Sequence, residues 1–240
     1  MNTNRLVKIV PVAAALLFAG SVLAAPLPAF TARYQLLQGD TPIGEATMTL
    51  APAGDGAWTF TTDSKGTSGM AALLGADARE TSTFRWKGDV PEGLNYDYSM
   101  DAAIRHKQRN VRFDWSSNTI VVNDRGEHRY PAQAGTVERH TIVLAIAAEL
   151  AAGKREFVLP VAVRDRVDLQ HFAARGKNAI SVPSGDYADA VHVARTDKSG
   201  AFDAWFVPGK LPVPVEVSQH DNGDFTLKLQ SYETGAANRQ

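Results

Sequence analysis

The feature that most constrains this chain is an alternation of apolar and polar residues that recurs along most of its length. A period of two predicts strands with one buried and one solvated face. Early examples of the apolar positions are Phe30, Ala32, Tyr34, Leu36, then Phe84, Trp86, then Leu94, Tyr96, Tyr98. Gly, Asp, Asn and Pro stand at nearly every join, which is typical of antiparallel hairpins. The sequence therefore predicts a meander of about a dozen antiparallel strands.

One segment, from Glu138 to Ala152, departs from this alternation. Its apolar residues fall on one helical stripe, and they are Ile142, Val143, Ile146 and Leu150. Gly153 can close the helix, and either Thr136 or Thr141 can begin it. The stripe needs a surface to cover. We therefore expect a mainly β fold: a large curved antiparallel meander, an open or half barrel, packed around one central α-helix.

A second unusual segment, Lys65 to Ala78, is short and rich in small residues. Two interpretations fit it. The segment is either a short helix packed into the core or a lid over a cavity, and the packed element is favoured.

The first residues have the organisation of a secretory signal. Arg5 and Lys8 precede an uncharged apolar run, and Val22-Leu23-Ala24 offers small residues for a signal peptidase. The run is shorter than the about 20 residues that a spanning helix needs. We expect residues 1–24 to be a cleaved signal peptide, residues 25–240 to be a single all-β domain, and no transmembrane segment to remain after cleavage.

Cysteine content and charge narrow the class of protein further. The chain has no Cys, so a lipoprotein anchor, disulfides and thiolate metal sites are excluded. Lys plus Arg number 25 against 26 for Asp plus Glu, so no net positive field favours nucleic acid. The expected product is an exported periplasmic protein that binds no nucleic acid.

Several short motifs together resemble a known family. They are Phe30-x-Ala32-x-Tyr34, Ile43-Gly44, Glu80-x-Ser82-x-Phe84, Phe113-x-Trp115, Val182-Pro183-Ser184-Gly185, a strand ending in Arg195, and Trp205 followed by Leu211-Pro212-Val213. In this combination the chain resembles the exported bacterial proteins of the domain of unknown function 3108 family. The resemblance implies an exported all-β protein and brings no activity or catalytic residues. One departure is that Thr136-Val137-Glu138-Arg139-His140 has no Asp near the start of the helix.

No motif of enzymatic chemistry is present. The sequence lacks Gly-x-Ser-x-Gly, His-Glu-x-x-His, a P-loop and Gly-x-Gly-x-x-Gly. No two of the six His have the i, i+2 or i, i+4 spacing of ligands on one strand or helix face. We therefore expect no catalytic residue, no metal site and no cofactor, and we lean away from an enzyme.

The sharpest candidate for a binding residue is Glu80. In the register of Phe84 and Trp86 its carboxylate lies on the apolar face, where it needs a partner, and Arg109 and Arg195 are candidates. A buried ion pair or a hydrogen bond to the backbone is favoured over a polar anchor in a ligand cavity. His171 shares a strand face with Val167 and Leu169. The candidate ligand-binding residues are Glu80, Phe84, Trp86, Tyr98, Arg109, His171 and Arg195.

The basic run from Arg105 to Arg112 has two interpretations. It can meet anionic lipid or polysaccharide, but a solvated strand edge is favoured. The favoured function is a non-enzymatic binder or shield of an apolar ligand, such as a lipid or envelope precursor. The alternative is an envelope assembly or scaffold factor with protein or polysaccharide partners, and an envelope-polymer hydrolase is the third hypothesis.

Overall fold

The alternating segments form strands of a single sheet, as the computed structural model shows for residues 27–235 except 74, 104, 199 and 221–223. The expected signal peptide, residues 1–24, lies outside the described residues. Within them there are fifteen strands and two helices. The elements are β1 (Phe30–Gln38), β2 (Thr41–Gly54), β3 (Ala57–Gly66), α1 (Gly69–Leu73), β4 (Asp77–Lys87), β5 (Val90–Ala102), β6 (Arg105–Asp114), β7 (Thr119–Asn123), β8 (Glu127–Pro131), β9 (Val137–Glu138), α2 (Ile142–Ala151), β10 (Glu156–Ala162), β11 (Val167–Val182), β12 (Gly185–Arg195), β13 (Phe202–Phe206), β14 (Glu216–Gln219) and β15 (Phe225–Thr234).

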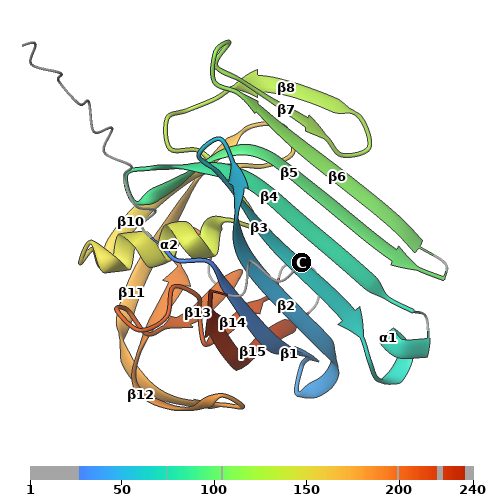
Figure 1. Ribbon diagram of the computed structural model, residues 1–240, viewed down its shortest axis with the longest axis vertical. Helices are drawn as coiled ribbons and strands as arrows, with labels where there is room; N and C mark the ends of the chain where they lie inside the picture. The colour runs from blue at the N-terminus through green and yellow to red at the C-terminus, as the bar shows by residue number, and fades with distance from the viewer. Residues whose placement is uncertain (1–26, 74, 104, 199, 221–223, 236–240) are drawn as a thin grey trace, which may run out of the picture.

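The fold is one large open sheet, and the mainly β, antiparallel prediction is confirmed. The strand order is β8-β7-β6-β5-β4-β3-β2-β1-β15-β14-β13-β12-β11-β10-β9. Neighbouring strands are antiparallel except for β9 and β10. Figure 1 shows how strongly the sheet curls. Its two ends approach each other: β9 contacts β5, and the Tyr130 hydroxyl donates a hydrogen bond to the Val163 carbonyl at 2.5 Å.

Curling gives the sheet a buried inner face with two apolar clusters. The larger cluster joins β1–β4, β10–β15 and α2, with Phe30, Phe60, Phe84 and Leu229 fully buried. The smaller one lies between β5–β8 and the β10–β11 hairpin around Tyr96 and Ile120. The larger cluster surrounds the candidate site described below.

The expected long helix exists, but it begins later than Glu138. Val137 and Glu138 form β9, and the helix α2 has Thr141 as its N-cap residue. Of the two expected starts, Thr141 is therefore correct and Thr136 is wrong. Gly153 follows the helix at φ 79°, a left-handed conformation that glycine adopts readily. The helix contacts β5, β9 and β10. No helix in the described part of the chain is long and apolar enough to cross a membrane.

The segment from Lys65 to Ala78 contains α1 at the turn between β3 and β4. Helix α1 contacts β2 and β3, and the Ser68 hydroxyl donates to the Pro42 carbonyl at 2.6 Å. The helix remains at the surface, since Leu73 is 76% exposed. It is thus a short packed helix, but it is not part of the core.

The Ile43-Gly44 motif has a steric explanation. Gly44 is buried in β2, and a Cβ atom there would lie 2.2 Å from the Lys65 carbonyl oxygen in β3. Two strands can approach this closely only where one of them lacks a side chain.

Candidate functional site

Polar side chains gather on the inner face of the sheet, where the chain enters α2. Glu138, in β9, is 1% exposed, and its carboxylate accepts hydrogen bonds from the backbone N–H groups of His140 and Thr141 at 2.6 and 3.1 Å. These N–H groups precede a helix, where a negative charge is favoured. Glu138 therefore supplies the carboxylate near the helix start.

A chain of hydrogen bonds connects this carboxylate to β3 and β4. The Ser82 hydroxyl donates to Glu138 Oε1 at 2.7 Å, His140 Nδ1 lies 2.7 Å from Ser82 Oγ, and His140 Nε2 lies 2.8 Å from Thr62 Oγ1. Since Ser82 has one proton and donates it to Glu138, His140 Nδ1–H donates to Ser82. Nε2 then accepts from Thr62. Burial lowers the His140 pKa, which agrees with a neutral ring.

This arrangement differs from a catalytic triad. In a triad the His accepts the nucleophile's proton and the acid holds the other ring nitrogen. Here the Glu138 carboxylate accepts the hydrogen bond of the Ser82 hydroxyl directly, and His140 donates a hydrogen bond to Ser82. The cluster fixes the start of α2 against β3 and β4.

Glu80 lies beside this chain, and its partner is Arg139. The Arg139 Nε atom lies 3.5 Å from Glu80 Oε2, and the Tyr96 hydroxyl donates to the same oxygen at 2.6 Å. Burial alone would raise the Glu80 pKa, but the Arg139 charge and the Tyr96 hydrogen bond outweigh it and hold the pKa below its usual range. The favoured ion pair exists, but its partner is Arg139 rather than Arg109 or Arg195, and it is only part-buried because Arg139 is exposed.

A cavity of about 300 Å³ opens next to these groups, inside the curl of the sheet. Its apolar lining comes from β1–β3, α2, β11 and β13–β15, and from Ala201, which lies between β12 and β13. The apolar residues are Leu36, Met48, Phe60, Ile142, Val143, Phe172, Ala201, Phe202, Val217, Phe225 and Leu227. The polar residues are Thr62, Ser64, Glu80, Arg139, His140, Gln170, Arg195 and Gln219. Arg139 and Gln219 are exposed and mark where the cavity meets solvent.

Two of the residues expected to bind a ligand, Glu80 and Arg195, line this cavity together. Arg195 ends β12, where its guanidinium holds Asp197. Phe84 and Trp86 belong instead to the packed interior. Phe84 is fully buried, and the Trp86 ring packs edge-on against it with centroids 4.9 Å apart.

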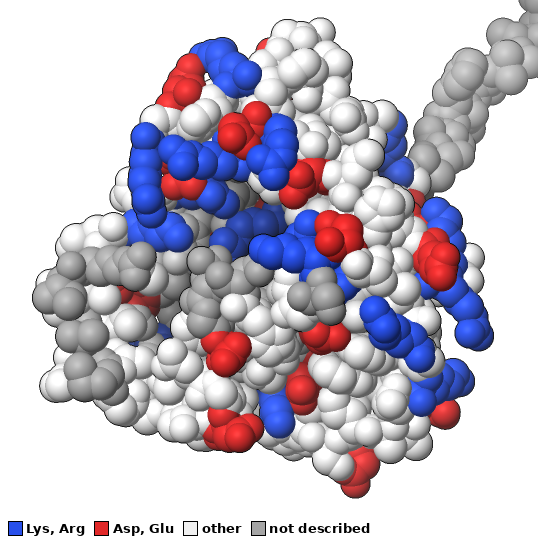
Figure 2. All heavy atoms as spheres, turned by 180° about the vertical axis from the view of Figure 1, so that it is seen from behind, with Lys and Arg blue, Asp and Glu red and all other residues white. Residues whose placement is uncertain are grey.

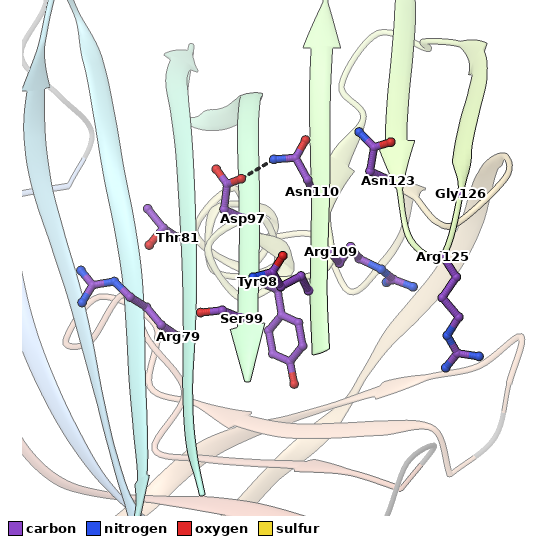
Figure 3. Close-up of a pocket in the computed structure, with 11 residues that line it drawn as sticks. Arg79, Thr81, Asp97, Tyr98, Ser99, Arg109, Asn110, Asn123, Arg125 and Gly126 are labelled. Carbon is purple, nitrogen blue, oxygen red and sulfur yellow. Dashed lines mark hydrogen bonds between the residues drawn. The ribbon is translucent and has the colours of Figure 1, made fainter. Parts of the chain in front are cut away.

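Tyr98 and Arg109 line a different hollow, a polar groove of about 500 Å³ across β4–β7. Thr81, Asp97, Asn110 and Asn123 stand opposite one another in successive strands there. Figure 3 shows Arg79 and Arg125 on opposite sides of this groove. Arg109 is paired with Asp124.

The basic run lies in β6, which pairs with β5 along its length but with β7 only from Asn110 onward. The charge-rich half is therefore a strand edge within the described sheet, as the favoured interpretation predicts. Figure 2 shows Lys and Arg gathered on the back of the molecule around a hollow.

The expected orientation of His171 is wrong. The inner face of β11 carries Gln170 and Phe172, which are 7% and 2% exposed, whereas His171 is exposed and Leu169 is 55% exposed. The apolar residues Val167 and Leu169 suggested the opposite register. Hydrophobic residues at a surface are common, so two of them did not suffice to fix the register.

Local sequence patterns did not indicate five of the polar residues at this site, namely Thr62, Glu138, Arg139, His140 and Gln170. A signal existed for part of this set, because Glu80 and Ser82 on an apolar face require polar partners. Nothing local indicated that the partners lie in β9 and the following loop, some 60 residues away in sequence. In the described part of the chain, no group of three or more His, Asp or Glu could hold a metal ion.

Comparisons with known proteins agree with this fold. The chain matches the family described as Protein of unknown function (DUF3108) over residues 30–230. No curated protein matches it. Its structure is similar to the crystal structure of the β-barrel-like protein of domain of unknown function DUF1849 from Brucella abortus, with a TM-score of 0.50 and 10% identity over 88% of this chain and 99% of that one. At this identity the similarity describes the fold alone.

Proposed function

The chain belongs to the DUF3108 family, because the match spans most of its length, and we propose that it binds an apolar or amphiphilic ligand inside the curled sheet. In this proposal it acts as a non-enzymatic carrier or shield for a lipid or an envelope precursor. Its place of action is the periplasm, which it reaches through a signal peptide cleaved after residue 24.

The observation that supports the proposal is the lining of the interior cavity. A volume of about 300 Å³ is at the lower end of the range for small-molecule sites. Apolar walls with a few convergent polar groups are the usual composition of such sites. Here the lining is largely apolar, and Glu80, Arg139 and Arg195 are the charged residues in it.

The helix has a defined part in this proposal. Ile142 and Val143, in the first turn of α2, line the cavity, and the Glu138 network holds that turn against the sheet. We take α2 to be the central helix around which the sheet curls. It would then close one wall of the binding site.

The test is binding of N-phenylnaphthylamine, a neutral fluorophore that brightens in apolar surroundings. The wild type should bind it saturably, and Val217→Phe should weaken binding because the larger ring takes up part of the cavity. Val158→Phe is the matched control, since Val158 is 45% exposed. Equal binding by all three proteins, or none by the wild type, would refute the proposal.

A second candidate function is contact with an envelope polysaccharide through the polar groove. Its support is the row of Asp97, Asn110 and Asn123 with arginines on both sides (Figure 3). Sugars are bound by such amide and carboxylate groups through hydrogen bonds. Loss of sedimentation with isolated envelope polysaccharide in Asn110→Ala, but not in Val217→Phe, would support this function over the first.

A further inference from the structure

The charged side chains that line the cavity already have partners. Glu80 is paired with Arg139 and accepts from Tyr96. Arg195 holds Asp197 with Nε at 3.0 Å and Nη2 at 2.7 Å, and Asp168 lies 3.9 Å away. The hydrogen bond from Arg195 lowers the pKa of Asp197 to about 2, so this carboxyl is ionised near neutral pH.

These pairs leave no excess charge for a ligand to neutralise. The two cations in the lining are balanced by Glu80 and Asp197, and Asp168, near Arg195, is itself paired with Arg166. A ligand with a charged head group would lose hydration without gaining an unpaired counterion. Burying an uncompensated ion is among the most costly changes in a protein interior.

Three polar side chains in the lining are buried, namely Thr62, His140 and Gln170. Thr62 and His140 are hydrogen-bonded to each other. Gln170 is only 7% exposed and lines the cavity. Its side chain has no hydrogen-bond partner among the described residues. Its amide atoms are not enclosed by the protein, so its two N–H donors and its carbonyl acceptor can bind polar groups that enter the cavity.

We infer that the head group of the ligand is uncharged and both donates and accepts hydrogen bonds to Gln170, as the hydroxyl and ester groups of a monoacylglycerol or an N-acyl amide do. This inference rests on the proposed function, since it names the class of ligand for the same cavity. The chain of the ligand lies along Phe60, Phe172 and Val217. At about 30 Å³ for each water-sized group, the cavity accommodates about ten such groups, shared between the head group and the part of the chain next to it.

The experiment compares three decyl-chain probes that differ in head group: monodecanoylglycerol, decanoate and decyltrimethylammonium. Each competes with N-phenylnaphthylamine at pH 8, below its aggregation concentration. The neutral probe should displace the fluorophore at a concentration at least tenfold lower than either ion. Gln170→Met, which keeps the length of the side chain but removes the amide, should reduce this preference to less than threefold.

Gln219→Met is the matched control, because Gln219 also lines the cavity but is exposed to water. It should keep the tenfold preference. Unchanged affinity of Gln170→Met for the fluorophore shows that its cavity is intact. If that variant does not fold, the ranking of the three probes by the wild type decides alone.

Equal or tighter binding of decanoate or of the cation overturns the inference while leaving a binding cavity in place. So does a neutral preference that Gln170→Met retains. Failure of the wild type to bind the fluorophore or any probe is a different result, because it removes the proposed function and the inference together.

Discussion

At the scale of single residues, the molecule depends on a small number of polar groups inside an apolar sheet. Glu138 is the most connected of them, since its carboxylate accepts from one side chain and two backbone N–H groups. Buried polar groups stabilise a structure when every member is paired and become costly when one partner is removed. The residues around Glu138 should therefore respond strongly to substitution.

Glu138→Ala should lower the free energy of unfolding by about 2–4 kcal/mol, because Ser82 and two backbone N–H groups lose their acceptor. Urea denaturation followed by tryptophan fluorescence measures the change. Glu127→Ala is the control, since Glu127 is exposed and paired only with Arg129, and it should change the value by less than about 0.5 kcal/mol. A Glu138→Ala effect as small as the control would contradict this assignment.

His140 should make stability depend on pH. Burial lowers its pKa from the usual 6.5, so the unfolded chain binds a proton more readily than the folded one. Its contribution is complete above pH 6.5 and is lost as the pH falls below that value. Below pH 6.5 the free energy of unfolding should fall as the pH falls, with a slope of at most about 1.4 kcal/mol per pH unit.

His140→Gln should flatten this slope, as urea denaturation at pH 7.5, 6 and 5 would measure. The lowered Glu80 pKa acts in a separate window, because its contribution is lost only as the pH falls below the usual carboxyl value of 4.5. An unchanged slope in His140→Gln would show that His140 does not titrate as inferred.

At the scale of elements, local sequence patterns predicted most of the strands, since alternation and turn residues act over a few positions. Their predictions were less accurate where a helical pattern and a strand pattern overlapped. The local pattern predicts that Val137 and Glu138 lie near the beginning of a helix. They form β9 instead, because they pair with β10, which comes close only in the folded chain. The predicted buried face of β11 was wrong for a similar reason, because the burial of Gln170 and Phe172 depends on the curl of the whole sheet.

The close approach of β2 and β3 gives a prediction for the Ile43-Gly44 motif. Gly44→Ala would place its Cβ atom against the Lys65 carbonyl, so one strand must move. The free energy of unfolding should fall by about 1–3 kcal/mol or more. Glu45→Ala, at the exposed neighbouring position, should be nearly neutral in the same thermal or urea denaturation. Equal stability of the two variants would contradict the steric explanation.

At the scale of the whole molecule, the proposed ligand binding depends on the curl of the sheet. The curl brings β4, the β9–α2 connection and β11–β15 around one cavity. The sequence indicated an inner apolar face and the Glu80 carboxylate on it. The cavity and the partners of Glu80 depend on residues far apart in sequence, so they could not be predicted from local patterns. Glu80 and Arg195, which were expected to bind a ligand, both line this cavity, and their binding of a ligand stays a prediction.

The most direct test of ligand binding is native mass spectrometry of the protein purified gently from the periplasm, followed by organic extraction. The wild type should carry a discrete lipid-sized adduct, and Val217→Phe, purified in the same way, should carry less of it because the larger ring takes up part of the cavity. A bare mass for the wild type, or an adduct of equal abundance on Val217→Phe, would contradict binding in the interior cavity.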